Sequence, residues 1–130
     1  MTEQGADEYG SRLAKAAVIV ATGLCLGRDY VKAVEWYEKA ANQGNADAQH
    51  TLGLLYYLGE SVGRDYVQAA QWYEKAASQG NADAQYNLGM MYYHGEGVIH
   101  DREKSCGLWK MSAEQNDESA TEAYERYCSD

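Results

Sequence analysis

A 36-residue repeat is the feature that most constrains what this chain can fold into. Residues 27–62 and 63–98 are identical at 26 of 36 positions, with no gap between them. The same frame continues to Asp101, which follows Asp65 by 36 residues. Periods of this length are typical of stacked supersecondary units, none of which can bury its apolar face alone. The sequence therefore predicts a single domain built from repeats.

The repeat frame divides the chain into three units and a terminal segment. We expect the units at about residues 10–45, 46–81 and 82–117, followed by a C-terminal capping helix at 118–130. The start of the first unit is degenerate, as is common at the ends of repeat arrays. A second alignment, which starts from the Ala6–Asp7 pair and includes a short insertion, stays open.

Each unit reads as two helices with their own cap residues. In the second unit, Ala48, Leu52 and Leu55 recur at the spacing of one helix face. Asp65 is placed to cap the next helix and Gly80 to end it. Further cap and turn residues are expected at Asp29, Gly44, Asn45, Gly59, Asn81, Gly95 and Asp101, and core positions at Trp36, Trp72 and Trp109. This recurring pattern of helix faces and cap residues predicts an all-α solenoid of antiparallel helix pairs.

Two long motifs run through the repeat: AAQWYEKAASQGN at residues 69–81 and ADAQYNLGMMYYHGEGVIHD at residues 82–101. They resemble the Sel-one-like repeat family, the 36-residue relative of the tetratricopeptide repeats, and the resemblance is close over residues 27–117. It implies a right-handed superhelix of helix pairs that serves as an adaptor or scaffold for other proteins. Family members often have Pro after the GV pair, where this chain has Gly63 and Ile99.

A second stripe on the first helix of each unit is the candidate binding surface. It contains more hydrophobic and aromatic residues than a solvated helix face needs, and Tyr and Met suit protein recognition. Several mismatches between the two closest units fall on this stripe, as expected of a groove that diversifies while packing residues repeat. For Tyr57 and Tyr93, packing against the adjacent unit is an equal alternative. The predicted partner-binding residues on the concave face are His50, Leu54, Tyr57, Leu58, Tyr86, Met90, Tyr93 and His94.

The acidic composition limits the class of partner. The 130 residues include 20 acidic and 11 basic ones, for a net charge of −9. Nucleic acids and anionic membranes are therefore poor candidates, because they are bound by clustered Lys and Arg. The apolar run at residues 16–27 is too short to span a bilayer. It follows acidic residues rather than the basic start of a signal peptide, so a cytoplasmic location is expected.

Motifs for catalysis or metal binding are missing from the sequence. The glycine-rich segment at residues 95–101 lacks the Lys-Ser/Thr pair of a phosphate loop, and there is no HExxH spacing. We therefore predict no catalytic residue, no metal and no cofactor. Cys25, Cys106 and Cys128 lack a CxxC spacing and differ from the one-disulfide-per-repeat pattern of some secreted family members. They are predicted to be free thiols in a reducing compartment.

The predicted function is that of a non-enzymatic interaction module, which binds a protein or peptide in the concave groove lined by the first helices. An alternative is an immunity or inhibitor protein that neutralises a toxin or secreted effector, since the charge of −9 would speed its encounter with a basic target. Two others stay open: a hydrolase like the β-lactam-associated members of the family, and a scaffold subunit that self-associates through its groove.

Overall fold

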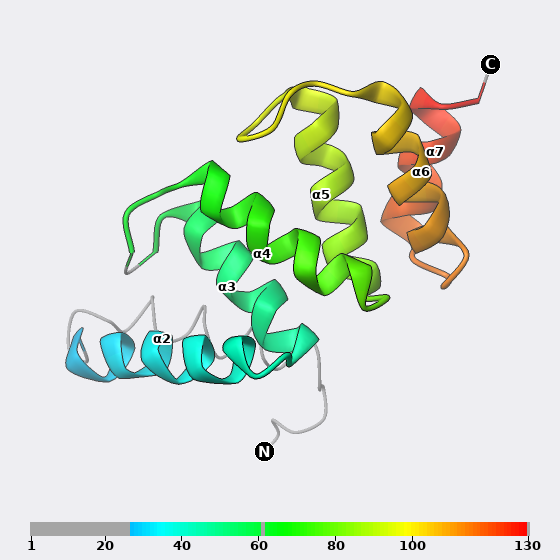
Figure 1. Cartoon of the computed structure of the whole chain (residues 1–130). Coiled ribbons are helices and arrows are strands. Elements are labelled where there is room, and N and C mark those ends of the chain that lie inside the picture. The colour runs from blue at the N-terminus through cyan, green and yellow to red at the C-terminus, as the bar shows by residue number, and fades with distance from the viewer. Residues whose placement is uncertain (1–26, 61, 130) are drawn as a thin grey trace.

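The computed structural model describes residues 27–60 and 62–129, and within these ranges the chain forms helices and no strand (Figure 1). The helices are α2 (Gly27–Asn42), α3 (Ala46–Leu58), α4 (Tyr66–Ser78), α5 (Ala82–His94), α6 (Arg102–Ala113) and α7 (Glu118–Tyr127). Within this described part, consecutive helices pack against one another, from α2 with α3 to α6 with α7. This chain of neighbouring contacts confirms the predicted all-α solenoid. The alternative alignment at the start of the chain lies outside the described residues.

Most helices begin and end at the predicted cap residues. The carboxylate of Asp65 accepts a hydrogen bond from the backbone N–H of Gln68 at 3.1 Å. The side-chain oxygen of Asn81 accepts one from the backbone N–H of Ala84 at 2.8 Å. Gly59 ends α3 with a φ of 76°, in the left-handed region that favours glycine. Asp29 is an exception, because α2 already includes Gly27 and the helix continues through Asp29. The prediction that Asp29 is an N-cap is therefore wrong.

Two glycines let large rings lie directly on neighbouring helices. A Cβ atom at Gly53 would stand 2.6 Å from the Tyr73 ring, and one at Gly89 would stand 2.6 Å from Nε1 of Trp109. Both rings are fully buried, so they have little freedom to move away. The close contact of α3 with α4, and of α5 with α6, therefore depends on glycine at these two equivalent positions.

The three tryptophans have different environments. Trp109 is completely buried, and Trp72 packs on the core cluster that Tyr56 and Val62 also contact. Trp36 is 66% exposed, so the prediction that it lies in the core is wrong. Trp36 stands one repeat before Trp72, and the residues that would correspond to Tyr56 and Val62 fall at 20 and 26, outside the described residues.

Buried glutamines connect successive units by a repeated set of hydrogen bonds. The Gln49 side chain donates to the Ala41 carbonyl at 3.0 Å and accepts from Gln79 at 2.9 Å. One unit later Gln85 and Gln115 take the same roles. Burying an amide is costly unless its hydrogen bonds are satisfied. Here each buried Gln joins the second helix of the preceding unit to the residues that follow the second helix of its own unit. The ladder fixes the register in which the units stack.

Helix α7 is the first helix of a fourth unit, in register with α3 and α5. It begins 36 residues after α5, and its cap Asp117 stands where Asn81 stands one unit earlier. Ala120 and Ala123 pack with Trp109 in one core cluster, which Tyr86 and Met90 also contact. The helix thus covers apolar side chains of α5 and α6.

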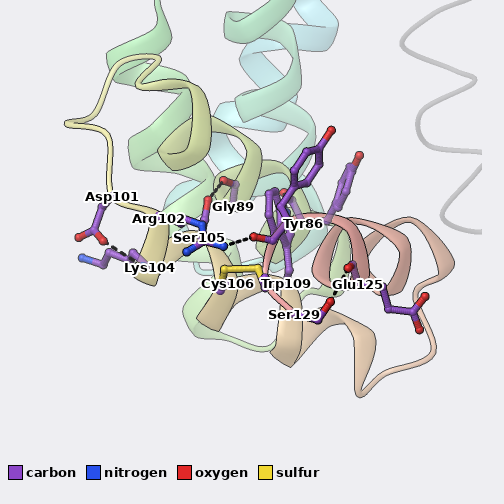
Figure 2. The surroundings of a disulfide bond; sticks show 12 residues. Tyr86, Gly89, Asp101, Arg102, Lys104, Ser105, Cys106, Trp109, Glu125 and Ser129 are labelled. Atoms are coloured by element: carbon purple, nitrogen blue, oxygen red, sulfur yellow. Dashed lines mark hydrogen bonds between the residues drawn. A yellow bond between two sulfur atoms is a disulfide. The ribbon is translucent and has the colours of Figure 1, made fainter.

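A disulfide between Cys106 and Cys128 ties the end of α7 to α6 (Figure 2). The Arg102 guanidinium also donates a hydrogen bond to the carbonyl of Tyr127. The interpretation of these two cysteines as free thiols is therefore wrong. Their separation of 22 residues forms no recognisable motif, and only the antiparallel packing of α6 and α7 brings them together. Cys25 lies outside the described residues.

Candidate partner-binding groove

A hollow of about 260 Å³ lies between α3 and α5. The buried side chains of Tyr73 and Met91 form part of its lining, so its floor is the packed core. Half-exposed and exposed side chains from the two helices form the rest, and Leu58 is the most open of them at 46%. The lining residues are Leu54, Tyr57, Leu58, Tyr73, Tyr86, Asn87, Met90 and Met91. The hollow can therefore accept an apolar side chain.

A second hollow, of about 150 Å³, lies between α5 and α7 and shares Tyr86 and Met90 with the first. Its other lining residues are more polar: Ser119, Glu122, Ala123, Arg126 and Tyr127. Because two side chains of α5 border both hollows, the hollows form one groove across α3, α5 and α7. The groove is apolar at its α3 end and charged at its α7 end.

Tyr57 is positioned by a hydrogen bond to the loop that follows α5. Its hydroxyl donates to Oε1 of Glu96 at 2.9 Å, and its ring lies 5.0 Å from the ring of Tyr66. Burial, then the hydrogen bond to the Glu96 carboxylate and its negative charge, raises the pKa of Tyr57 to about 12. Tyr57 thus lines the hollow and also packs against the next unit, through Glu96 and the core cluster that includes Leu88 and Met91. Packing against the adjacent unit is therefore observed, and a role of Tyr57 in binding stays a prediction.

Tyr86 stands between the two hollows in an acidic environment. Burial raises the pKa of its hydroxyl, and the negative charges of Asp117 and Glu122 raise it further. Its backbone carbonyl accepts a hydrogen bond from Nε1 of Trp109 at 3.2 Å, which fixes this turn of α5 on α6. The side chain of Tyr86 packs on the core cluster of Trp109, Ala120 and Ala123, and its hydroxyl lies in the negative field of the nearby carboxylates.

The predicted site residues do not all lie in this groove. Leu54, Tyr57, Leu58, Tyr86 and Met90 line the first hollow. His50 is only 2% exposed, with its ring 5.8 Å from that of Tyr73 and its Nε2 atom 3.2 Å from the Asn87 side chain. The placement of His50 on an open surface is therefore wrong, because α4 and α5 pack over it.

Tyr93 and His94 line neither of the two hollows. The ring of Tyr93 lies 4.7 Å from that of Tyr127 and 5.7 Å from that of Trp109, within the core that α7 covers. His94 is exposed at the end of α5 and contacts the edge of Tyr93. Of the two alternatives given for Tyr93, packing against the adjacent unit is the one that the structure shows.

Sequence reasoning missed the contribution of α7 and of the loop after α5. Adding 36 to Tyr86 and Met90 gives Glu122 and Arg126, which line the second hollow. The repeat frame could therefore have identified them, although the residue types differ completely. Glu96 has no such signal, since its role depends on the contact with Tyr57 across 39 residues of sequence.

Within the described ranges, no group of three or more His, Cys, Asp or Glu side chains is arranged to hold a metal ion. His100 is engaged through Nδ1 with the carbonyl of Tyr93 at 2.9 Å, and Asp101 caps α6. No described helix is long and apolar enough to cross a membrane. The groove is built from aromatic, aliphatic and charged side chains.

Comparison with known proteins gives the family. The chain matches the family model of the Sel1 repeat at residues 12–45, 46–81 and 82–117. A solved Sel1 repeat protein from Oxalobacter formigenes is 30% identical, with a TM-score of 0.75, over 92% of this chain and 90% of that one. A comparison with curated proteins found no match.

Two further solved structures are similar. One is a protective antigen of uropathogenic Escherichia coli with an SLR fold, 30% identical at a TM-score of 0.72. This alignment covers 86% of this chain but 24% of that one. The other is the cysteine-rich protein B of Helicobacter pylori, at 21% identity and a TM-score of 0.69, over 92% of this chain and 99% of that one; it shows the fold alone. The motifs, the stacked helix pairs and the three matched repeats together show that this chain belongs to the Sel1 repeat family.

Proposed function

We propose that this chain is a non-enzymatic interaction module that binds a segment of a partner protein in the groove across α3, α5 and α7. Sel1 repeat proteins are generally protein-interaction modules, and the family assignment brings that coarse function to this chain. What the proposal adds is the surface. A hollow with an apolar lining and a packed floor offers a pocket for an anchoring side chain, which is the usual centre of a protein interface.

The observation that supports this surface is where the two closest repeats differ. The residues that hold the units together are the same in both units: Leu52 matches Leu88, and Gln49 matches Gln85. Six of the eight residues that line the first hollow stand at positions where the units differ: Leu54, Leu58, Tyr86, Asn87, Met90 and Met91. Packing must repeat in a solenoid, whereas a bound ligand has no such period.

A matched pair of variants tests the proposal. Leu58→Glu places a carboxylate at the rim of the first hollow. Val67→Glu makes the same change on α4, at a third hollow of about 440 Å³ that shares no lining residue with the other two, so it also tests that hollow as the binding surface. The two side chains are similarly exposed, at 46% and 52%, so both variants should fold. We expect Leu58→Glu to lose partners captured by the wild-type chain from native lysate, as quantified by mass spectrometry, and Val67→Glu to retain them.

Equal capture by the two variants, with unchanged circular dichroism and melting temperature, would rule out this groove as the binding surface. A Tyr93→Ala variant is a poor choice, because Tyr93 packs on Trp109 and Tyr127 and its loss would open the core. Turnover of a chromogenic β-lactam by the wild-type chain would contradict the non-enzymatic part of the proposal.

The sequence and the disulfide predict different cellular compartments for this chain. The cytoplasmic location expected from the sequence stays a prediction, while the Cys106–Cys128 disulfide favours an oxidising compartment, where such bonds persist. Alkylation of thiols in intact cells before lysis distinguishes the two. A cytoplasmic chain would be labelled at both cysteines, and a chain in an oxidising compartment at neither.

A further inference from the structure

The helices that line the groove differ in charge from those that do not. Five acidic residues and one basic residue occur in α3, α5 and α7: Asp47, Asp83, Glu118, Glu122, Glu125 and Arg126. In α4 and α6 the balance is reversed, with four basic residues and two acidic ones: Lys75, Arg102, Lys104, Lys110, Glu74 and Glu103. The groove helices thus carry a net negative charge and α4 and α6 together a net positive one, while α2, which lines neither hollow, is balanced.

Carboxylates stand beside both hollows. The Glu96 carboxylate accepts a hydrogen bond from the hydroxyl of Tyr57 at the first hollow, and Glu122 lines the second hollow. Glu118 lies one turn before Glu122 on α7, and Asp117 caps that helix. Among the described residues that line either hollow, Arg126 is the one basic side chain. The positive charge of Arg64 also acts on Tyr57 at the first hollow. The carboxylates of Glu96, Asp117, Glu118 and Glu122 outnumber these two cations, which leaves the groove with a net negative charge.

This arrangement combines an apolar pocket with an acidic rim. An apolar side chain gains free energy by entering the hollow, where Leu54 and Met90 replace water. A ligand with the opposite charge gains in addition from attraction at the rim, and a ligand with the same charge is repelled. The complementary ligand is therefore apolar at one point and cationic around it.

We propose that the partner segment is cationic: one apolar side chain enters the hollow between α3 and α5, and flanking Lys or Arg side chains meet Glu96 and Glu122. This inference rests on the proposed function, since it specifies the partner of the same groove. A second copy of the chain is a poor occupant. A symmetric contact through this face would bring the acidic residues of α5 and α7 against themselves.

Selection of random peptides tests the charge of the ligand directly. A phage-displayed library of 12-residue random peptides is panned on the immobilised, disulfide-bonded full chain. Clones are kept if Leu58→Glu abolishes their binding and Val67→Glu does not. We expect these groove-dependent peptides to contain more Lys and Arg than Asp and Glu, clustered around a Leu, Met or aromatic residue.

Selected peptides are then synthesised and titrated by fluorescence anisotropy at 20 and 300 mM NaCl. Glu122→Gln should weaken binding by about two- to fivefold at low salt, the effect of removing one partly exposed ion pair. High salt should reduce that difference, because it screens exposed charges. The matched control is Glu74→Gln on α4, which makes the same change of net charge outside both hollows and should leave the affinity unchanged.

The outcomes separate this inference from the function beneath it. Groove-dependent peptides that are neutral or acidic would overturn the cationic partner while the groove keeps its role. Equal effects of Glu122→Gln and Glu74→Gln would also overturn it, since long-range net charge would then explain the preference. Two results would contradict both the cationic partner and the proposed function. One is a complete lack of groove-dependent peptides, and the other is dimerisation in light scattering that Leu58→Glu abolishes.

Discussion

Gly53 and Gly89 show how single atoms decide the distance between helices. They occupy equivalent positions in successive units, and each lies against a buried ring, Tyr73 in one case and Trp109 in the other. Gly107 is also within a helix, but a Cβ atom there would have no neighbour within 4 Å. The same residue type thus serves close packing at two positions and has no packing role at the third.

Gly53→Ala and Gly89→Ala are each expected to lower the free energy of unfolding by about 1–3 kcal/mol, because the added methyl group must displace a buried ring. Gly107→Ala is the control and should raise it by about 0.5–1 kcal/mol, since alanine favours a helix and meets nothing. Urea unfolding followed by circular dichroism measures all three. Stabilisation by either of the first two changes would contradict the close contacts.

Tyr57 is expected to make stability depend on alkaline pH. Its pKa is about 12 in the folded chain against 10.0 as the ordinary value, so the unfolded chain releases this proton first. The stability that Tyr57 contributes is therefore present below pH 10 and lost as the pH rises from about 10 to 12. Tyr57→Phe should show a smaller drop in melting temperature between pH 9 and 11 than the wild type.

Glu96→Gln provides the control for this titration. It removes the carboxylate whose hydrogen bond and charge raise the pKa of Tyr57. In an absorbance titration at 295 nm, a tyrosinate step near pH 12 in the wild type should be missing in Tyr57→Phe and shifted to lower pH in Glu96→Gln. An unchanged titration in both variants would show that the hydroxyl is not held by Glu96.

At the scale of elements, α7 covers part of the core and forms one side of the groove. It packs Ala120 and Ala123 on Trp109, supplies one wall of the second hollow, and is tied to α6 by the disulfide. A ten-residue helix is too short to be stable alone in water. Its structure therefore depends on these contacts, and the polar end of the groove depends on α7.

Cys128→Ser should destabilise the chain by about 3 kcal/mol, the loop-closure effect expected for a bridge of this span. The cysteines are 22 residues apart. Reduction of the wild-type chain with dithiothreitol should lower the melting temperature to the same value, and the variant should not respond to the reductant. Labelling of Cys106 or Cys128 by a thiol reagent in the folded, unreduced chain would contradict the disulfide.

At the scale of the whole molecule, the described residues form a row of helices whose main contacts are between consecutive helices. Stability in such a row is close to a sum of local terms, so it need not be uniform along the chain. The central helices α4 and α5 (Figure 1) contribute to the largest core cluster, whereas α7 contributes Ala120 and Ala123 to a smaller one with Trp109. Helix α7 should therefore open before α4 and α5.

Native-state hydrogen exchange is expected to show this gradient. Amides in α4 and α5 should exchange with the highest free energies, and amides in α7 with lower ones once the Cys106–Cys128 bond is reduced. Disulfide-bonded protein serves as the control, in which the difference should be smaller. Equal protection of all described helices after reduction would indicate one cooperative globular unit instead of a repeat array.

Much of the fold could be read from the sequence because it depends on local rules. Asp65, Asn81 and Gly59 determine where helices begin and end through bonds to residues three or four positions away. The 36-residue period requires that whatever packs one unit on the next recurs, which identifies Leu52 and Leu88 as core residues. Five of the eight predicted site residues line the first hollow, because the helical period separates the packed stripe of α3 and α5 from the second stripe on the same helices.

Other features depend on the neighbours that a residue meets in space. The repeat pattern predicts an exposed His50 and a buried Trp36. In the structure the neighbouring helices bury His50, while Trp36 is exposed to solvent. Cys106 and Cys128 form no sequence motif, and Glu96 reaches Tyr57 only because the loop after α5 folds back over α3 and α4. The sequence by itself determined the helices, their period and the family. Only the tertiary structure decided which side chains are accessible, which cysteines meet and where the groove ends, because these follow from distances between residues far apart in the chain.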